Sequence, residues 1–168
     1  MTLKPRTLLP AHLKLNMADF EIEQWHNSGA ISIWHYEDFP KNYHGYHLMA
    51  DQTGCDFLRG LVERFRKARY PARKKFALRP PTRNQLAVPN CSKKCLPARN
   101  VEFRFRHEFD KAHWMISEKS GELVIELGTA GLQELDRGVS DMTQGRGDWA
   151  MGGASKALWF WWHPAHGT

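Results

Sequence analysis

Two stretches of the chain repeat their apolar residues at helical spacing. Between residues 53 and 69 the apolar stripe consists of Phe57, Leu58, Leu61, Val62 and Phe65. Between residues 130 and 144 it consists of Leu132, Leu135, Val139 and Met142. This spacing places the apolar side chains on one face of an α-helix. The pattern therefore predicts two main helices, near residues 53–69 and 130–144.

Other stretches alternate apolar and polar residues, as half-buried strands do. Residues 20–25 and 30–36 flank a turn at Asn27-Ser28-Gly29 and predict a hairpin, with 46–50 as a third strand. Further strands are predicted at residues 75–79, 101–107, 113–117, 122–127, 148–151 and 157–162. The chain shows no regular strand–helix–strand rhythm, so we predict an α+β protein with mainly antiparallel sheet.

The pattern also predicts how the chain is divided. Residues 1–18 are expected to form an N-terminal arm, 19–79 a first α+β lobe and 101–168 a second one. Residues 80–100 hold four prolines and predict a long loop or linker. Both lobes follow a similar order, which a duplicated strand-strand-strand-helix-strand unit would explain. The alternative is that this order arose by chance, and that the chain forms one compact domain.

Positive charge is concentrated in one segment. The chain has 168 residues and a formal net charge of +6. Residues 64–100 contain 12 of the 24 basic residues and no Asp or Glu, so the remainder is net acidic. Such segregation indicates an anionic partner, which is an acidic protein, a nucleic acid or an acidic membrane surface.

Within this segment, the candidate partner contacts are Arg66, Arg69, Arg73, Lys74 and Lys75. They are interleaved with aromatic residues, an arrangement that suits gripping phosphates and stacking bases. The alternative for any charge run is a solvated surface that binds nothing.

A run of four aromatic residues near the C-terminus gives the second candidate contacts, Trp159 and Trp162. Neighbouring residues of a strand face opposite sides, so the run cannot point into a single core. Either the strand is covered on both faces, or part of the run forms an aromatic binding surface.

Signals for catalysis or cofactors are weak. His44 and His47, His163 and His166, and Cys91 and Cys95 have metal-like spacings, but the pairs are scattered and do not form a four-ligand set. The chain has no Gly-x-Ser-x-Gly elbow and no phosphate-binding glycine loop. We therefore predict no metal, no cofactor and no catalytic residue, with a small enzyme of unknown chemistry as an alternative.

Cysteine usage and hydropathy bear on location. Three cysteines are too few for a disulfide scaffold, which favours a reducing, cytoplasmic environment. No run approaches the roughly 20 apolar residues of a spanning helix, and the first residues do not form a secretory signal. The sequence leaves the oligomeric state open.

The C-terminal segment carries a resemblance. It combines Gly131-Leu132, Glu134-Leu135, Gly138, Asp141-Met142, Gly145, Gly147-Asp148-Trp149 and Leu158-Trp159-Phe160-Trp161-Trp162. Over about 45 residues this resembles the end of small bacterial proteins, some of which are similar to immunity proteins of polymorphic toxin systems. The resemblance implies a non-catalytic protein that neutralises a toxin domain.

Together, these patterns predict a non-catalytic binding protein that holds an acidic protein partner. A nucleic-acid-binding protein, acting mainly through phosphate contacts, is the alternative.

Overall fold

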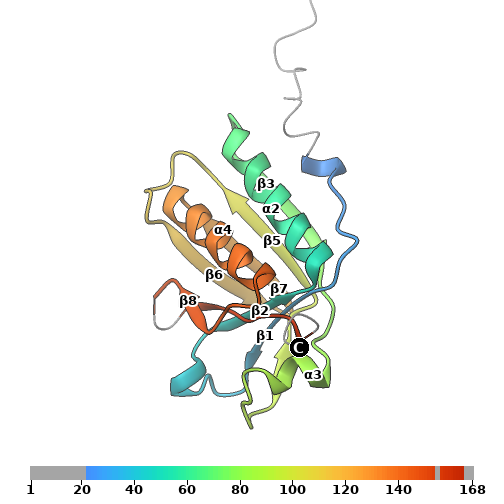
Figure 1. Cartoon of the computed structure of the whole chain (residues 1–168). Coiled ribbons are helices and arrows are strands. Elements are labelled where there is room, and N and C mark those ends of the chain that lie inside the picture. Colours follow the sequence, from blue (N-terminus) through green and yellow to red (C-terminus); the bar gives the residue numbers. More distant parts are fainter. Residues whose placement is uncertain (1–21, 154–155, 165–168) are drawn as a thin grey trace, which may run out of the picture.

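The computed structural model describes residues 22–153 and 156–164 (Figure 1). Its helical elements are η2 (Lys41–Tyr43), α2 (Gln52–Lys67), α3 (Arg83–Ala87) and α4 (Thr129–Thr143). Its strands are β1 (Ile31–Tyr36), β2 (Tyr46–Ala50), β3 (Ala72–Ala77), β4 (Cys95–Pro97), β5 (Asn100–Phe105), β6 (Trp114–Lys119), β7 (Glu122–Leu127), β8 (Trp149–Met151) and β9 (Leu158–Phe160). None of the described helices is long and apolar enough to cross a membrane.

The strands form two sheets. The first has the order β4-β1-β2-β9-β8 and the second the order β3-β5-β7-β6. Only the pairs β2–β9 and β5–β7 are parallel, and the other described pairs are antiparallel. The predicted α+β class with mainly antiparallel pairing is confirmed.

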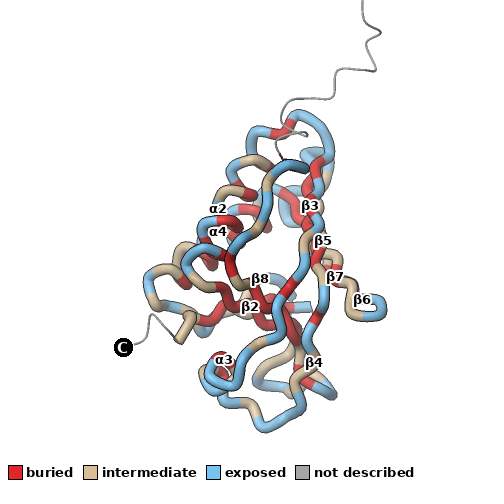
Figure 2. Tube along the Cα trace, turned by 90° about the vertical axis from the view of Figure 1, so that its right-hand side faces the viewer, coloured by how far each residue is buried: buried red, intermediate tan, exposed pale blue. Residues whose placement is uncertain are grey.

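Both predicted helices are present. The Asp51 side chain accepts a hydrogen bond of 2.7 Å from the Gly54 backbone N–H and so caps the start of α2. The apolar stripes of α2 and α4 are buried, and the helices lie side by side across the sheets (Figure 1). In Figure 2, buried and more exposed residues alternate along β5 and β7, because only one face of that sheet meets the helices.

Apart from η2, α3 and β4, the two halves of the chain share one order of elements. The hairpin β1–β2 is followed by α2 and the antiparallel pair β3–β5, while β6–β7 is followed by α4 and β8–β9. Each sheet joins the first antiparallel pair of one half to the second antiparallel pair of the other, through a parallel pair. The repeated unit is therefore strand-strand-helix-strand-strand, not the predicted strand-strand-strand-helix-strand. Each sheet contains strands from both predicted lobes.

The predicted strand over residues 20–25 and its hairpin are wrong. Residues 22–24 are helical, and β1 pairs with β2 and β4 instead. Ile22 is buried, and the indole N–H of Trp25 donates to the Phe57 carbonyl oxygen of α2. Two apolar residues three positions apart suit a helical turn as well as they suit a short strand. The predicted arm, residues 1–18, lies outside the described residues.

The predicted loop at residues 80–100 contains regular structure. Thr82 and Gln85 form a reciprocal capping box that starts the short helix α3. Further on, β4 pairs with β1 at the edge of its sheet. The strand predicted at 75–79 begins earlier, at Ala72, and its pairing with β5 ends at Ala77.

The described residues form two apolar cores. The main core lies between the helices and the sheets, whereas a smaller one on the other face of the first sheet contains Trp34, Tyr36, Met49 and Trp161. Strand β9 lies between β2 and β8. Its Phe160 enters the main core, and Trp161, the residue that follows β9, enters the second core. Within the aromatic run, Phe160 and Trp161 are buried, whereas Trp159 and Trp162 are half-buried against the second core. A Cβ at Gly138 of α4 would lie 2.4 Å from the Phe160 ring, so the close approach of α4 requires glycine there.

Candidate partner-binding surface

Most of the predicted basic contacts lie at the end of α2 and along β3. Three cations, Arg64, Arg66 and Lys67, occupy the last turn of α2, where they interact favourably with the partial negative charge of the helix end. The helix stops at Ala68, whose backbone is extended, and Pro71 then leads the chain into β3. This short connection places the basic residues of two elements at one end of the molecule (Figure 1).

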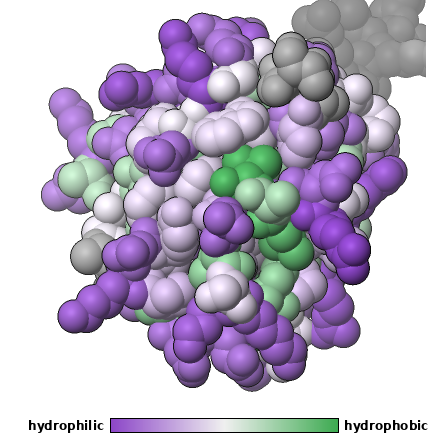
Figure 3. Space-filling model, turned by 60° about the horizontal axis from the view of Figure 1, so that its bottom comes forward, coloured by the Kyte–Doolittle hydropathy of each residue, from purple (hydrophilic) through white to green (hydrophobic). Residues whose placement is uncertain are grey.

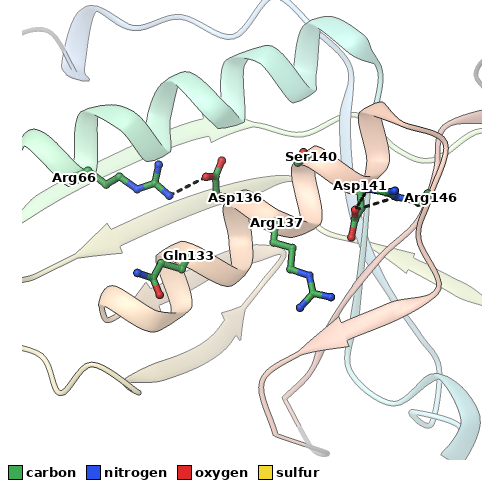
Figure 4. A pocket seen from close by; sticks show the side chains of 7 residues that line it. All are labelled: Arg66, Gln133, Asp136, Arg137, Ser140, Asp141 and Arg146. Atoms are coloured by element: carbon green, nitrogen blue, oxygen red, sulfur yellow. Dashed lines mark hydrogen bonds and ion pairs between the residues drawn. The ribbon is translucent and has the colours of Figure 1, made fainter.

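Arg66 is engaged within the protein. Its guanidinium donates to Glu63 at 2.6 Å. It also donates to Asp136 of α4 at 2.8 Å (Figure 4). The hydrogen bond to Asp136 is the main reason that the pKa of Arg66 is raised. Arg66 therefore links α2 to α4. Because its guanidinium is already paired with two carboxylates, Arg66 is a weaker candidate for contact with a partner.

Lys74 and Lys75 differ because they face opposite sides of β3. The Lys74 side chain is buried on the helix side, and its ammonium donates to the Glu23 carbonyl oxygen at 2.7 Å. Burial lowers the pKa of Lys74. This corrects the expectation of an exposed contact at Lys74. Lys75 points outward and forms an ion pair of 2.5 Å with Glu122.

The remaining cations are uncompensated. Lys67, Arg69 and Arg73 are exposed and form no ion pair within the described part of the chain. Between them lies Tyr70, 60% exposed, the only large hydrophobic residue that is exposed among the described residues. We call Lys67, Arg69, Tyr70 and Arg73 the α2–β3 surface.

Two functional candidates were missed by sequence reasoning. The register of β3 and β5 sets Arg104 directly opposite Arg73, and Arg106 follows on the same face. Arg73, Arg104 and Arg106 line a pocket of about 400 Å³ together with Pro71 and Ala72. The alternation of residues 101–107 gives the outward direction of both missed arginines, but no local signal pairs residue 104 with residue 73.

Trp159 and Trp162 lie elsewhere. Both are half-buried against the second core, and the Trp159 indole N–H donates to the His44 carbonyl oxygen at 2.9 Å. In Figure 1 the end of α2 is at the top, whereas β1 and α3, which frame the second core, are at the bottom. The structure therefore does not bring the predicted basic and aromatic contacts together.

The bottom of the molecule carries an apolar band (Figure 3). Half-buried apolar residues that pack on the second core are Tyr43, Leu86, Val88, Cys91, Cys95, Trp159 and Trp162. Burial raises the pKa of the Cys95 thiol to about 11, which keeps it protonated and weakly nucleophilic at neutral pH.

The histidines at the second core are held by internal hydrogen bonds. His47 Nδ1 accepts from the Trp161 indole N–H at 3.0 Å, which leaves Nε2 to donate to the Tyr43 carbonyl oxygen at 3.2 Å. The His44 ring lies 3.0 Å from the Phe39 carbonyl oxygen. Within residues 22–153 and 156–164, no three His, Cys, Asp or Glu side chains are grouped so that they could hold a metal ion.

A second, larger pocket lies along the outer face of α4 (Figure 4). It measures about 760 Å³ and is lined by Arg66, Gln133, Asp136, Arg137, Ser140, Asp141 and Arg146. Its carboxylates are neutralised locally, because Asp136 accepts from Arg66 and Asp141 accepts from Arg146 and Trp149. The balance of charge makes this pocket a weaker candidate than the α2–β3 surface.

Comparison with known proteins adds no assignment, since neither the profiles of protein families nor the curated protein sequences match this chain.

Proposed function

We propose that this protein is a non-catalytic binding protein that holds an acidic protein partner through the α2–β3 surface. The observation that carries this proposal is a group of exposed cations without carboxylates to neutralise them, arranged around an exposed Tyr70. Arginine and tyrosine are the residue types that most often supply binding energy at protein interfaces.

Electrostatics gives such a surface a second advantage. An uncompensated positive patch attracts a negatively charged partner over distances up to the Debye length, about 8 Å at physiological salt. This attraction raises the association rate more than it raises the final affinity. A partner that binds here should therefore associate faster at low salt.

The resemblance of the C-terminal segment suggests the kind of partner. A toxin domain with an acidic surface would suit both this resemblance and the charge of the α2–β3 surface. A non-catalytic role also agrees with the hydrogen bonds of the second-core histidines, because both ring nitrogens of His47 and the Nδ1 of His44 already have partners within the protein.

Co-purification from the native host, followed by mass spectrometry, tests this proposal. We expect one acidic protein to be retained by the wild type. The double variant Arg69→Ala/Arg73→Ala should bind it at least tenfold more weakly, or about 1.4 kcal/mol. The matched control is Arg79→Ala/Arg83→Ala, which removes the same charge from exposed positions elsewhere in the basic segment and should change the affinity less than twofold.

Two results would overturn the proposal. One is an equal loss of affinity in both double variants, since that would reflect net charge alone. The other is recovery of no protein partner together with turnover of a small molecule.

Nucleic-acid binding is the second candidate, and Tyr70 is the observation that favours it. An exposed aromatic ring among arginines can stack on a base while the arginines contact phosphates. Each phosphate contact contributes to the dependence of affinity on salt, so Arg69→Ala/Arg73→Ala should lower the magnitude of the log–log slope by about 2. Replacing Lys74 and Lys75 should leave the slope nearly unchanged, because the first is buried and the second is paired.

Selectivity separates the two candidates. We expect binding to DNA and RNA to be indiscriminate and to fade by about 150 mM salt, a physiological ionic strength. Tight binding to one strand type or sequence at that salt would make nucleic acid the preferred ligand.

A further inference from the structure

The pocket beside the α2–β3 surface contains a local conflict of charge. Arg73 and Arg104 are directly opposite each other on neighbouring strands, and both side chains face outward. Like charges in that position destabilise a sheet. Arg106 adds a third positive charge to the same pocket. Places where a sequence breaks such a local rule are often functional sites, where a ligand supplies the missing charge.

Two carboxylates hold the Arg104 guanidinium in a fixed position. Its Nε donates to Glu102 at 2.5 Å and its Nη1 donates to Glu126 at 3.3 Å, and these bonds raise the pKa of Arg104, the bond to Glu102 most strongly. Its Nη2 has no hydrogen-bond partner among the described residues. The two carboxylates thus fix the guanidinium plane while one of its nitrogens remains available.

The other two arginines are less constrained. The Arg106 guanidinium lies over the Phe109 ring, 5.6 Å from its centre, and is exposed. Arg73 is exposed and has no carboxylate partner in the described chain. One fixed and two adjustable guanidinium groups can close around an anion from different directions.

We infer that this pocket binds the phosphoryl group of a small phosphate monoester. A carboxylate has two oxygens and can be satisfied by one arginine, whereas a phosphoryl group presents three terminal oxygens to three guanidinium groups. The volume of about 400 Å³ lies within the range of small-molecule sites and exceeds what a bare ion needs. The exposed ring of Pro71 gives the pocket lining an apolar part against which the organic part of the ester packs.

This inference goes beyond the proposed function, because it requires no protein partner. The site and the proposed interface have only Arg73 in common. Two charges oppose the ligand, Glu102 and Glu126, and Glu126 is also 3.3 Å from the Nε2 of His113. Three arginines against these two carboxylates leave the site net positive, and a phosphate monoester, which carries more than one negative charge at neutral pH, complements it.

Binding is measured by NMR titration at pH 7.5 and constant ionic strength, with inorganic phosphate, glycerol 3-phosphate and acetate as probes. We expect saturable shifts at residues 71–73 and 104–106 with both phosphates, and none with the same concentration of acetate. Arg104→Lys keeps the charge but loses the planar fork, so it should weaken phosphate binding at least tenfold.

Further variants keep the test decisive. If Arg104→Lys does not fold, Arg73→Lys and Arg106→Lys, both at exposed positions, take its place and should each weaken binding several-fold. The control Arg83→Lys, at an exposed position of α3, should bind phosphate as the wild type does. Equal responses to acetate and phosphate, or no saturable response, would overturn the inference.

The variants also separate this inference from the proposed function. Arg106→Lys should weaken phosphate binding and leave capture of the protein partner unchanged, whereas Arg69→Ala should do the reverse.

Discussion

His47 shows how one buried residue makes the stability of this protein depend on pH. The ring is fully buried among aromatic side chains, and it stacks on Trp34 and Trp161. Both ring nitrogens have partners, but the Nδ1 acceptor role requires the neutral form. Burial therefore lowers the pKa of His47 from 6.5 to about 4.

We expect this histidine to reduce stability as the pH falls. The unfolded chain takes up the proton near pH 6.5 and the folded protein only near pH 4, so acid favours unfolding between these values. The contribution of His47 is complete above pH 6.5, and about 2 kcal/mol of it is lost by pH 5. Urea unfolding at pH 7.5 and pH 5 measures this loss.

His47→Gln is the matched variant, because an amide can still accept from Trp161 and donate to Tyr43 but does not titrate. Its free energy of unfolding should change about 2 kcal/mol less than that of the wild type between the two pH values. An equal change in both proteins would show that His47 titrates normally. The NMR shift of the His47 ring protons, constant down to pH 5, would provide direct support.

Residue types could be predicted at the candidate site, but not the direction of each side chain. The concentration of charge in residues 64–100 is a property of the sequence alone. That Lys74 faces the core while its neighbours Arg73 and Lys75 face outward follows from the start of β3 at Ala72, which was predicted three residues too late. The predicted strand began at Lys75 and so assigned no side to Lys74.

At the scale of elements, the two sheets are joined by a hydrogen bond between their strands. The Tyr46 hydroxyl on β2 donates to Glu118 Oε2 on β6 at 3.0 Å, and His35 Nε2 lies 3.5 Å from the same oxygen. Burial and then the Glu118 charge raise the pKa of Tyr46. The tyrosine therefore remains a donor at neutral pH.

Removal of this hydroxyl should destabilise the protein. Tyr46→Phe is expected to lower the free energy of unfolding by about 1.5–3 kcal/mol, the usual cost of a lost hydrogen bond to a charged group. In a double-mutant cycle with Glu118→Gln, the two changes should be non-additive by about 1 kcal/mol. Urea unfolding of the four proteins gives the coupling energy.

Tyr70→Phe is the control, since its ring is 60% exposed, and its effect should stay within about 0.5 kcal/mol. Strict additivity in the cycle would contradict a link between the sheets through Tyr46 and Glu118.

Helices were easier to predict than strand partners for a physical reason. The stripes of α2 and α4 depend on residues three or four positions apart, so the pattern is local. Strand pairing joins distant segments, such as β2 with β9, and nothing in either segment identifies the other. The arginine pocket could not be predicted because it depends on such a pairing, between β3 and β5.

At the scale of the whole molecule, each half of the chain depends on the other for its fold, because both sheets contain strands from both halves. One edge of strand β2 pairs with β9 of the other half, and one edge of β5 pairs with β7 of the other half. The helices α2 and α4 also pack against each other, and one apolar core extends through both halves. Neither half can bury its apolar surface alone.

We therefore expect the chain to unfold as one cooperative unit. Far-UV circular dichroism and tryptophan fluorescence should give the same midpoint in urea, because tryptophans lie in both cores. The fragments 1–109 and 110–168, cut between β5 and β6, should each lack the dispersed NMR spectrum of a folded protein and should recover it when mixed. Two separate transitions, or a dispersed spectrum from either fragment alone, would show that the halves fold independently. A fragment that folded alone would have to satisfy the edge of β2 or β5 that the other half covers in the full chain.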